Sequence, residues 1–518
     1  LGDTEVTRQL ADGPLAVTEQ RDDADAQGMP QRLEDLGGSA IQYYSAYAAA
    51  FEPVRRKRDI LLIDQRGTGE SAHIDCPIDD DIVEGQYSAE ETITFTQACL
   101  DQLPHDPRFF TTSVAVKDLE ALREALGYPA LNLLGTSYGS RVAQHFARRY
   151  PDSTRTIIID GVVPPQVPLG PEIATESQRA LDRVIERCAG EPACHERFPT
   201  LRQDFEQLQE TLATGPVTVS VPNPMTGEPE TLEFSNEHMK VAIRLLLYDA
   251  RSIALIPLSI SAAANGNYTP LAAQFQMTAT SLSEALNIGM HNAVMCTEDM
   301  PFIDFDAVDQ DAIDASYLGP LQLEAIRTMC SAWPQGPMDD DLLTPLATDI
   351  PVLLLSGDAD PITPPRYAEL AAVDLEKAWL LTGTNQSHGL GPVGCMPRVI
   401  GGFVSAMALE DGAADCLSDA FAMPFFLDFT NDDREVRERL FDTAGATTAT
   451  CVEPLHDDRL ADIGFRHDQL VHIQVVVVFR VGNRRLKAFL HVERDALLRE
   501  GQVVQRLFHL LAADQARD

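Results

Sequence analysis

The feature that most limits how this chain can fold is a five-residue segment, Gly135–Gly139, with the sequence Gly-Thr-Ser-Tyr-Gly. It matches the pattern G-x-S-x-G, in which small residues beside a serine permit a sharp turn from a strand into a helix. The apolar run 131–134 precedes it, and an amphipathic helical pattern over 140–150 follows it. This order predicts a turn that presents the Ser137 hydroxyl as a nucleophile. The backbone N–H of Tyr138 would then face a developing oxyanion.

Further apolar runs end at clusters of turn and polar residues, as buried strands of a parallel sheet do. Residues 60–63 lead into 64–71 (Asp-Gln-Arg-Gly-Thr-Gly-Glu-Ser), and residues 352–355 lead into a loop at 356–360. A weaker apolar run covers 378–381. We therefore predict an α/β fold with a mostly parallel sheet, flanked by helices, whose carboxyl ends carry the functional loops.

A serine hydroxyl is a weak nucleophile, so it requires a base within hydrogen-bond reach and a third group that orients the base. His388 lies in a loop late in the domain, after the weaker strand, and is the predicted general base. Asp360, in the loop after the strand at 352–355, is the predicted orienting acid. Asp358 remains open as a rival acid or a turn former.

The long stretch between the strand at 156–160 and the strand at 352 is rich in helical patterns, for example over 178–187 and 237–248. Inserted there, it would form a cap over the carboxyl ends of the strands and enclose a substrate, although such helices could equally form a passive second domain. The predicted organisation has four parts: a poorly matched segment at 1–35, a core at 36–165 and 345–430, a helical cap at 166–344, and a carboxy-terminal extension at 431–518.

The formal net charge of −39 excludes whole classes of partner, because it repels nucleic-acid phosphates and anionic membrane surfaces. No apolar run approaches the roughly 20 residues of a membrane-spanning helix. We therefore expect neither nucleic acid nor a membrane as partner. The sequence leaves the oligomeric state open.

Nine cysteines are present, and the first eight fall into neighbouring couples. None of the cysteines forms a Cys-x-x-Cys pair of the kind that, with another such pair or a histidine couple, indicates a zinc site. We therefore expect disulfides, no metal and no cofactor. Disulfides would place the protein in an oxidising compartment, secreted or periplasmic, although sequence spacing alone does not fix their connectivity. The hypothesised pairs are Cys76–Cys99, Cys188–Cys194, Cys296–Cys330 and Cys395–Cys416, which leave Cys451 over.

Together, the segment at 64–71, the Gly-Thr-Ser-Tyr-Gly turn, the Asp-Pro-Ile-Thr-Pro loop from Asp360 and the Ser-His-Gly loop at His388 resemble a known family. They are similar to the proline iminopeptidase and tripeptidyl-aminopeptidase group of α/β-hydrolases, over about residues 36–430. Paired cysteines around the histidine look like the exported tripeptidyl-aminopeptidase branch. The resemblance implies an α/β-hydrolase fold and a serine peptidase that releases residues or short peptides from free amino termini.

The chain departs from the family pattern at its amino end. There the family has an apolar strand followed by a glycine-rich loop, whose backbone supplies the second oxyanion donor. Residues 36–40 (Leu-Gly-Gly-Ser-Ala) stand at this position and make Gly38 the expected donor, but the polar residues before them give no convincing strand. A poorly held donor would leave a folded but feeble enzyme.

Glu298, together with Asp299, is the predicted anionic site for the amino terminus of a substrate. The two acids lie between apolar residues beside Cys296, late in the cap. The alternative is a solvated acidic pair that caps a helix.

Two other functions compete with an aminopeptidase. The same triad would serve a carboxylesterase or related acyl hydrolase, because the fold does not choose between esters and amides. A non-catalytic binding protein on a hydrolase scaffold is the third interpretation. Residues 431–518 suggest no function, although 474–479 has strand character and 496–511 has helical character.

Overall fold

The computed structural model describes residues 38–69, 71–76, 88–223, 226–285, 287–419, 422–429, 473–481 and 484–492. The chain separates into two compact units, Pro30–Leu440 and a unit made of Leu1–Met29 and Phe441–Asp518. The second unit contains an antiparallel hairpin of β7 (Ile473–Val481) and β8 (Arg484–Val492), as the sequence indicates for 474–479. The sequence interpretations of residues 1–35, Cys451 and a helical segment at 496–511 lie outside the described residues.

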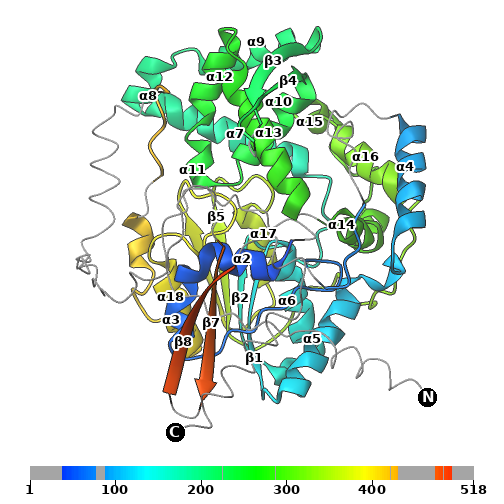
Figure 1. Cartoon of the computed structure of the whole chain (residues 1–518), viewed down its shortest axis with the longest axis vertical. Helices are drawn as coiled ribbons and strands as arrows, with labels where there is room; N and C mark the ends of the chain where they lie inside the picture. The colour runs from blue at the N-terminus through cyan, green and yellow to red at the C-terminus, as the bar shows by residue number, and fades with distance from the viewer. Residues whose placement is uncertain are drawn as a thin grey trace. The chain divides into compact units, whose positions relative to one another are not determined.

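A parallel sheet of four strands, in the order β1-β2-β5-β6, forms the centre of the larger unit (Figure 1). The apolar runs around the serine turn and the acid loop form its strands, as predicted. Each residue of β5 is buried, which is typical of a parallel sheet covered on both faces. The strands are β1 (Leu131–Thr136), β2 (Thr154–Asp160), β5 (Val352–Gly357) and β6 (Ala378–Gly383).

Alternate residues of the strands pack against helices on opposite faces of the sheet, because successive strand side chains point to opposite sides. Ile157 and Ile159 share a buried cluster with Phe146, whereas Ile158 shares another with Phe403. The helices that flank the sheet are α5 (Thr112–Leu126), α6 (Tyr138–Arg149), α17 (Pro365–Ala372) and α18 (Met396–Ala406).

The predicted strand over 60–63 is not a regular strand, and this prediction is wrong. The segment is half-buried, and none of the described strands pairs with it. An apolar run needs a neighbouring ladder to become a strand, and the described residues supply none here. The chain before and after it forms the elements α2 (Ala40–Tyr47), η1 (Ala48–Phe51), α3 (Glu52–Arg55), α4 (Ala89–Gln102) and η3 (Pro107–Phe109).

The insertion between β2 and β5 forms a cap with its own apolar core, in which Leu181, Phe205 and Ile243 are buried. Figure 1 shows most of its helices gathered beyond one end of the sheet. A short antiparallel pair of strands, which the sequence patterns did not indicate, adds to it. The elements are α7 (Ile173–Gly190), α8 (Pro192–Arg197), α9 (Leu201–Ala213), β3 (Val217–Pro222), β4 (Pro229–Phe234), α10 (Asn236–Leu246), α11 (Ala250–Ile253), α12 (Ile256–Ala264), α13 (Thr269–Ala285), α14 (Ile288–Val294), η5 (Met295–Asp299), η6 (Met300–Phe302), α15 (Gln310–Ala315) and α16 (Leu321–Cys330).

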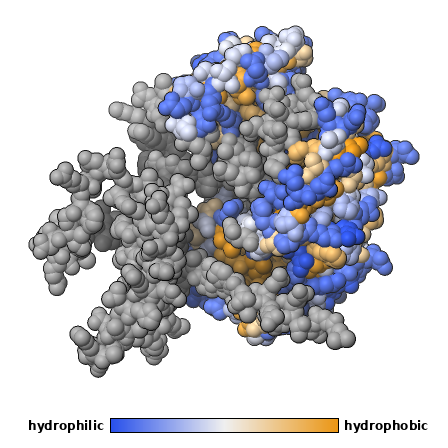
Figure 2. Space-filling view, turned by 45° about the vertical axis from the view of Figure 1, so that its right-hand side comes forward, coloured by the Kyte–Doolittle hydropathy of each residue, from blue (hydrophilic) through white to orange (hydrophobic). Residues whose placement is uncertain are grey.

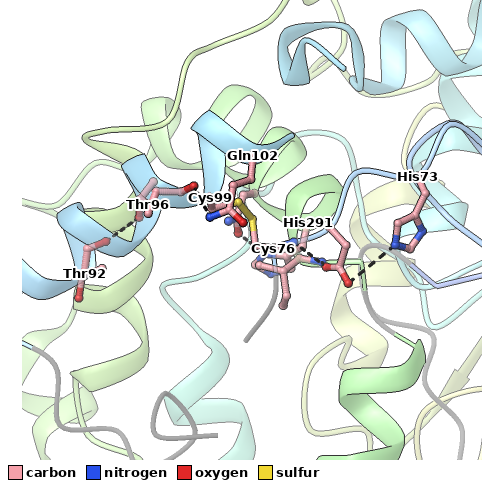
Figure 3. The surroundings of a disulfide bond; sticks show 11 residues. His73, Cys76, Thr92, Thr96, Cys99, Gln102 and His291 are labelled. Carbon is pink, nitrogen blue, oxygen red and sulfur yellow. Dashed lines mark hydrogen bonds and ion pairs between the residues drawn. A yellow bond between two sulfur atoms is a disulfide. The ribbon is translucent and has the colours of Figure 1, made fainter. Parts of the chain in front are cut away.

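Four disulfides join the hypothesised pairs, which confirms the pairing read from the sequence. Figure 3 shows Cys76 bonded to Cys99 of α4. Cys296–Cys330 joins η5 to α16, and Cys395–Cys416 fixes the start of α18. Disulfides of this number are typical of proteins from oxidising compartments.

The surface view in Figure 2 shows apolar residues distributed among hydrophilic ones on the described part of that face. Among the described residues, no helix has the length and apolar character required to cross a membrane.

Candidate active site

Ser137 lies at the turn between β1 and α6 in a backbone conformation that side-chain-bearing residues rarely adopt, with φ 53° and ψ −124°. Its N–H donates to the carbonyl of Asp160 at 2.8 Å. Gly135 makes the turn possible, because a Cβ there would lie 2.1 Å from the carbonyl oxygen of Gly139. The predicted strand, sharp turn and helix are therefore present, with the serine at the carboxyl end of β1.

His388 and Asp360 meet in the core although 28 residues separate them in the sequence. His388 Nδ1 lies 2.7 Å from Asp360 Oδ2, and the two residues are 1% and 0% exposed. Three further hydrogen bonds hold the carboxylate, from the N–H groups of Ile362 and Thr363 and from the Thr363 hydroxyl at 2.6 Å. These three hydrogen bonds fix the orientation of the carboxylate independently of its contact with the imidazole.

Thr363 is a contact of the pair that the sequence interpretation did not single out. Its Oγ1 lies 3.0 Å from His388 Nδ1 as well as 2.6 Å from Asp360 Oδ2. The signal was present in the Asp-Pro-Ile-Thr segment, since a threonine three residues after a loop aspartate can turn its hydroxyl back to the carboxylate.

Burial by itself would raise the pKa of Asp360. The charge and hydrogen bond of His388, together with the bonds from Thr363, outweigh burial and lower the pKa below its ordinary value. Asp360 is therefore ionised at neutral pH and can stabilise an imidazolium on His388.

Ser137 and His388 are brought to the same place by the end of β2. The Asp160 carbonyl accepts from the Ser137 N–H, and the next residue, Gly161, lies against the imidazole. A Cβ on Gly161 would stand 2.7 Å from His388 Cε1, and its φ of +60° also favours glycine. Ser137 and His388 thus both lie beside the dipeptide Asp160–Gly161 at the carboxyl end of β2.

Asp358, the rival acid, supports the loop that carries the histidine. Its Oδ1 accepts from the Asn385 N–H at 2.7 Å, and its Oδ2 pairs with Arg183 of α7 at 2.6 Å. Arg179 of α7 donates to the carbonyls of Asp358 and Asp360. The cap therefore braces the acid loop directly.

The cap also reaches the histidine. The Ser387 hydroxyl donates to the carbonyl of Leu247 at the end of α10. The ring of Tyr248, 5% exposed, lies edge-on to the His388 ring with centroids 5.6 Å apart. Helical periodicity placed this segment in the cap but could not indicate which of its residues faces the histidine.

The Asp-Gln-Arg segment at residues 64–66 supports the surroundings of the serine turn. Asp64 accepts from the Ser39 hydroxyl at 2.7 Å and from the Ile41 N–H, so it holds the chain next to Gly38. Gln65 donates to the Tyr138 hydroxyl at 3.1 Å. Gly38 is half-buried, and its role as an oxyanion donor stays a prediction.

Glu298 is fully buried on η5, a segment of π-helix. One carboxylate oxygen accepts from the Thr112 N–H at 2.6 Å, and the other accepts from the Thr112 hydroxyl at 2.7 Å. Since the single hydroxyl proton of Thr112 is used there, the Tyr138 hydroxyl is the donor in its 2.7 Å contact with Thr112. A chain of hydrogen bonds thus runs from Gln65 through Tyr138 and Thr112 to Glu298.

Burial raises the pKa of Glu298 to about 7, although the charge of Arg141 and the bonds from Thr112 oppose the rise. Arg141 is itself paired elsewhere: its guanidinium makes two bonds, of 3.0 and 2.9 Å, to Asp299. Asp299 also accepts from the Leu169 N–H. The two predicted acids consequently differ. Asp299 neutralises the buried cation Arg141, whereas Glu298 can gain or lose a proton near neutral pH.

Two family models match parts of this chain. Residues 30–219, which contain Ser137, match the family described as alpha/beta hydrolase fold, and residues 315–416, which contain Asp360 and His388, match the family described as TAP-like protein. The chain has an α/β-hydrolase fold.

Proteins similar to this chain include the serine protease Hip1 of Mycobacterium tuberculosis, 26% identical over 316 residues that cover 58% of this chain and 60% of the relative. A tripeptidyl aminopeptidase of Streptomyces coelicolor is 28% identical over 25% of this chain and 27% of its own length. The alignments thus span at most about 60% of these relatives. Among solved structures, the serine hydrolase CCSP0084 from Cycloclasticus zankles matches with a TM-score of 0.33 and 14% identity, covering 72% of this chain and 88% of that one.

Within the described ranges of this chain, no group of three or more His, Cys, Asp or Glu side chains could hold a metal ion.

Proposed function

We propose that this hydrolase is a serine aminopeptidase that works through Ser137, His388 and Asp360. The observation that carries the proposal is the buried His388–Asp360 contact of 2.7 Å beside a strained serine turn. Ser137 attacks the scissile carbonyl carbon while its proton passes to Nε2 of His388, and the imidazolium then protonates the departing amine. Water hydrolyses the acyl-enzyme by the same steps.

The tetrahedral oxyanion is bound, in this proposal, by the backbone N–H groups of Tyr138 and Gly38. The Tyr138 N–H belongs to the first residue of α6, so the helix dipole adds to its donor strength. Asp64 supports the Gly38 side through Ser39 and Ile41. No metal or organic cofactor takes part, and the four disulfides support export to an oxidising compartment.

We assign to Glu298 the binding of the substrate's amino terminus. Asp299 supports Glu298 in this role by pairing with Arg141. The names of the relatives, a serine protease and a tripeptidyl aminopeptidase, support peptide substrates. The hydrogen-bond chain from Glu298 to Tyr138 supports a place for the acid close to the serine turn. A carboxylate in so apolar a setting binds an ammonium far more strongly than an exposed one would.

A carboxylesterase is the second candidate, and one observation favours it. Glu298 is 0% exposed and both of its oxygens already accept hydrogen bonds from Thr112. An acyl hydrolase with an apolar pocket would need no change at this position, whereas an aminopeptidase must open a path to the acid.

A hydrolysis screen separates the candidates. The parent, Ser137→Ala and Glu298→Gln are assayed with amino-terminally free and blocked peptide anilides and with short-chain esters. Ser137→Ala should abolish hydrolysis and labelling by a fluorophosphonate. Glu298→Gln should lower kcat/KM for free-amine peptides by roughly 30- to several-thousand-fold, with much smaller effects on esters and blocked peptides. Equal loss on all substrates would make Glu298 structural and favour the esterase.

A further inference from the structure

Asp160 is a buried carboxylate, 2% exposed, at the carboxyl end of β2 in the middle of the sheet. Its two oxygens accept backbone hydrogen bonds from residues just after the histidine: the Leu390 N–H at 2.8 Å and the Gly391 N–H at 2.6 Å. The two partners lie about 230 residues away in the sequence. A buried carboxylate bonded to two backbone N–H groups is a strong and directional anchor.

The backbone of the same residue holds the serine turn, because the Asp160 carbonyl accepts from the Ser137 N–H at 2.8 Å. The following residue, Gly161, donates to the Leu355 carbonyl of β5 and lies against the imidazole of His388. One dipeptide thus contacts the nucleophile turn, the strand that leads to the acid, and the histidine loop.

The histidine loop needs such support because its backbone is unusual. Asn385 has φ 53° and Gly389 has φ 81°, so the segment bends sharply on both sides of the histidine. Asp358 holds the loop before His388 through the Asn385 N–H, and Asp160 holds it after His388. The side chain of Asp358 is 23% exposed, whereas Asp160 is shielded from water. Hydrogen bonds in the shielded site weaken less through competition with solvent.

We propose that Asp160 is a positioning residue that fixes His388 relative to Ser137. The proposal rests on the catalytic roles proposed above for those two residues. Asp160 acts through other residues: its carboxylate sets the place of the loop that carries the base, and its carbonyl sets the place of the nucleophile. Displacement of reacting groups by about 1 Å can reduce turnover on the order of 100-fold.

Two variants test it. Asp160→Asn keeps the shape but leaves one acceptor oxygen and turns an N–H₂ group toward the second backbone donor. Gly391→Ala keeps Asp160 and places a Cβ 3.1 Å from its Oδ2, which pushes loop and carboxylate apart slightly. The matched controls are Glu120→Gln, a carboxylate that bonds Ser153 away from the triad, and Gly402→Ala, whose Cβ would meet nothing within 4 Å.

For Asp160→Asn we expect kcat to fall about 100-fold with KM changed by less than about threefold, and for Gly391→Ala a fall of about tenfold. The second-order rate at which a fluorophosphonate labels Ser137 should fall in proportion. The acid limb of the kcat/KM profile should move to lower pH, because a displaced imidazolium is held less well by Asp360. A purely structural role would lower the melting temperature without moving the labelling rate or the pH profile. Both controls should keep the parental kcat within about twofold.

Parental kcat and labelling rate in folded Asp160→Asn would overturn the proposal. If Asp160→Asn does not fold, Gly391→Ala decides, and parental values there would overturn it. Hydrolysis that survives Ser137→Ala is a different failure, because it would remove the proposed function itself. An inactive Ser137→Ala beside a fully active Asp160→Asn would remove the positioning role alone.

Discussion

Two carboxylates, Asp360 in the hydrolase core and Glu298 in the cap, are equally buried, but their pKa values are shifted in opposite directions. Each is 0% exposed, and each accepts backbone and hydroxyl hydrogen bonds from a threonine. The pKa of Asp360 is lowered, whereas burial raises the pKa of Glu298 to about 7. Burial and threonine bonds therefore do not decide the charge of a carboxylate.

The difference comes from the cation that each acid can use. Asp360 has the imidazole of His388 at 2.7 Å, so ionisation of the acid is stabilised by its own partner. Glu298 is close enough to Arg141 to feel its charge, but the guanidinium makes its two bonds with Asp299. The lowered pKa keeps Asp360 ionised at neutral pH, whereas the raised pKa lets Glu298 gain or lose a proton near neutral pH.

The two acids consequently make opposite contributions to stability as pH falls. For Asp360 the pKa is lower in the folded state than in the unfolded state, so its contribution is present above the unfolded pKa and is lost as pH falls through the folded pKa. For Glu298 the folded protein holds a proton that the unfolded chain has released between pH 4.5 and about 7, so acidification through this window stabilises the fold.

The largest effect is expected for Asp360→Asn. The amide keeps the shape but cannot stabilise an imidazolium, and its N–H₂ group favours the wrong tautomer of His388. We expect kcat to fall by about 10⁴-fold at pH 7, measured with the substrate that the hydrolysis screen selects. Asp358→Asn is the control and should retain far more activity, since Asp358 supports the loop through Asn385. Equal losses in both variants would show that the orienting acid has been misassigned.

The sequence placed Asp360 and His388 in loops that meet in the fold, and their catalytic roles stay predictions. Each lies in a loop after an apolar run, and parallel strands bring such loops to one edge of the sheet. The disulfide pairs were predicted for a similar reason, since each joins residues near in the sequence, for example Cys188 and Cys194. Local patterns were sufficient wherever the chain itself brings the partners together.

The residues that support the site escaped prediction because their partners are distant in the sequence. Asp160 bonds Gly391 and Ser387 bonds Leu247, separations of 231 and 140 residues. The run at 60–63 shows the reverse case, since an apolar pattern without a described pairing partner did not become a strand. For Glu298, the sequence indicated an acid among apolar residues but not that Thr112 would engage both oxygens.

The next largest effect concerns Glu298→Gln and the pH dependence of stability. The difference between an ordinary pKa of 4.5 and about 7 corresponds to roughly 3 kcal/mol of unfolding free energy above pH 7. The parent should therefore lose about that much stability, relative to Glu298→Gln, as pH rises from 4.5 to 8. Denaturant unfolding at a series of pH values measures this loss of unfolding free energy. Glu120→Gln is the control, because the hydrogen bond from Arg123 lowers the pKa of Glu120, so Glu120 does not lose stability over this pH range. Parallel curves for parent and Glu298→Gln would contradict the raised pKa.

Thr363→Val sharpens the comparison from the core side. It removes the hydroxyl that contacts both Asp360 Oδ2 and His388 Nδ1 and retains the branched shape. A hydrogen bond to a charged group contributes about 1.5–3 kcal/mol, so kcat should fall by roughly 10- to 100-fold. Thr363→Ser, which keeps the hydroxyl, should restore most of it. Steady-state kinetics of the three proteins provide the check, and equal loss in the serine variant would show that the methyl group, through packing, is what matters.

The smallest effect is expected from the cap side, at Tyr248. Its ring packs edge-on against the His388 imidazole, 5.6 Å between centroids, and its hydroxyl accepts from Arg244 at 3.1 Å. Aromatic pairs of this kind contribute about 0.5–1.5 kcal/mol, so Tyr248→Leu should lower kcat by roughly two- to tenfold. Tyr248→Phe keeps the ring and removes the hydroxyl that accepts from Arg244, and it should match the parent. If Tyr248→Phe were as slow as Tyr248→Leu, the Tyr248 hydroxyl rather than its ring would account for the effect on kcat. The cap would then act on the histidine through Arg244 rather than through the ring, and the division between a core that sets the charges and a cap that sets the packing would fail.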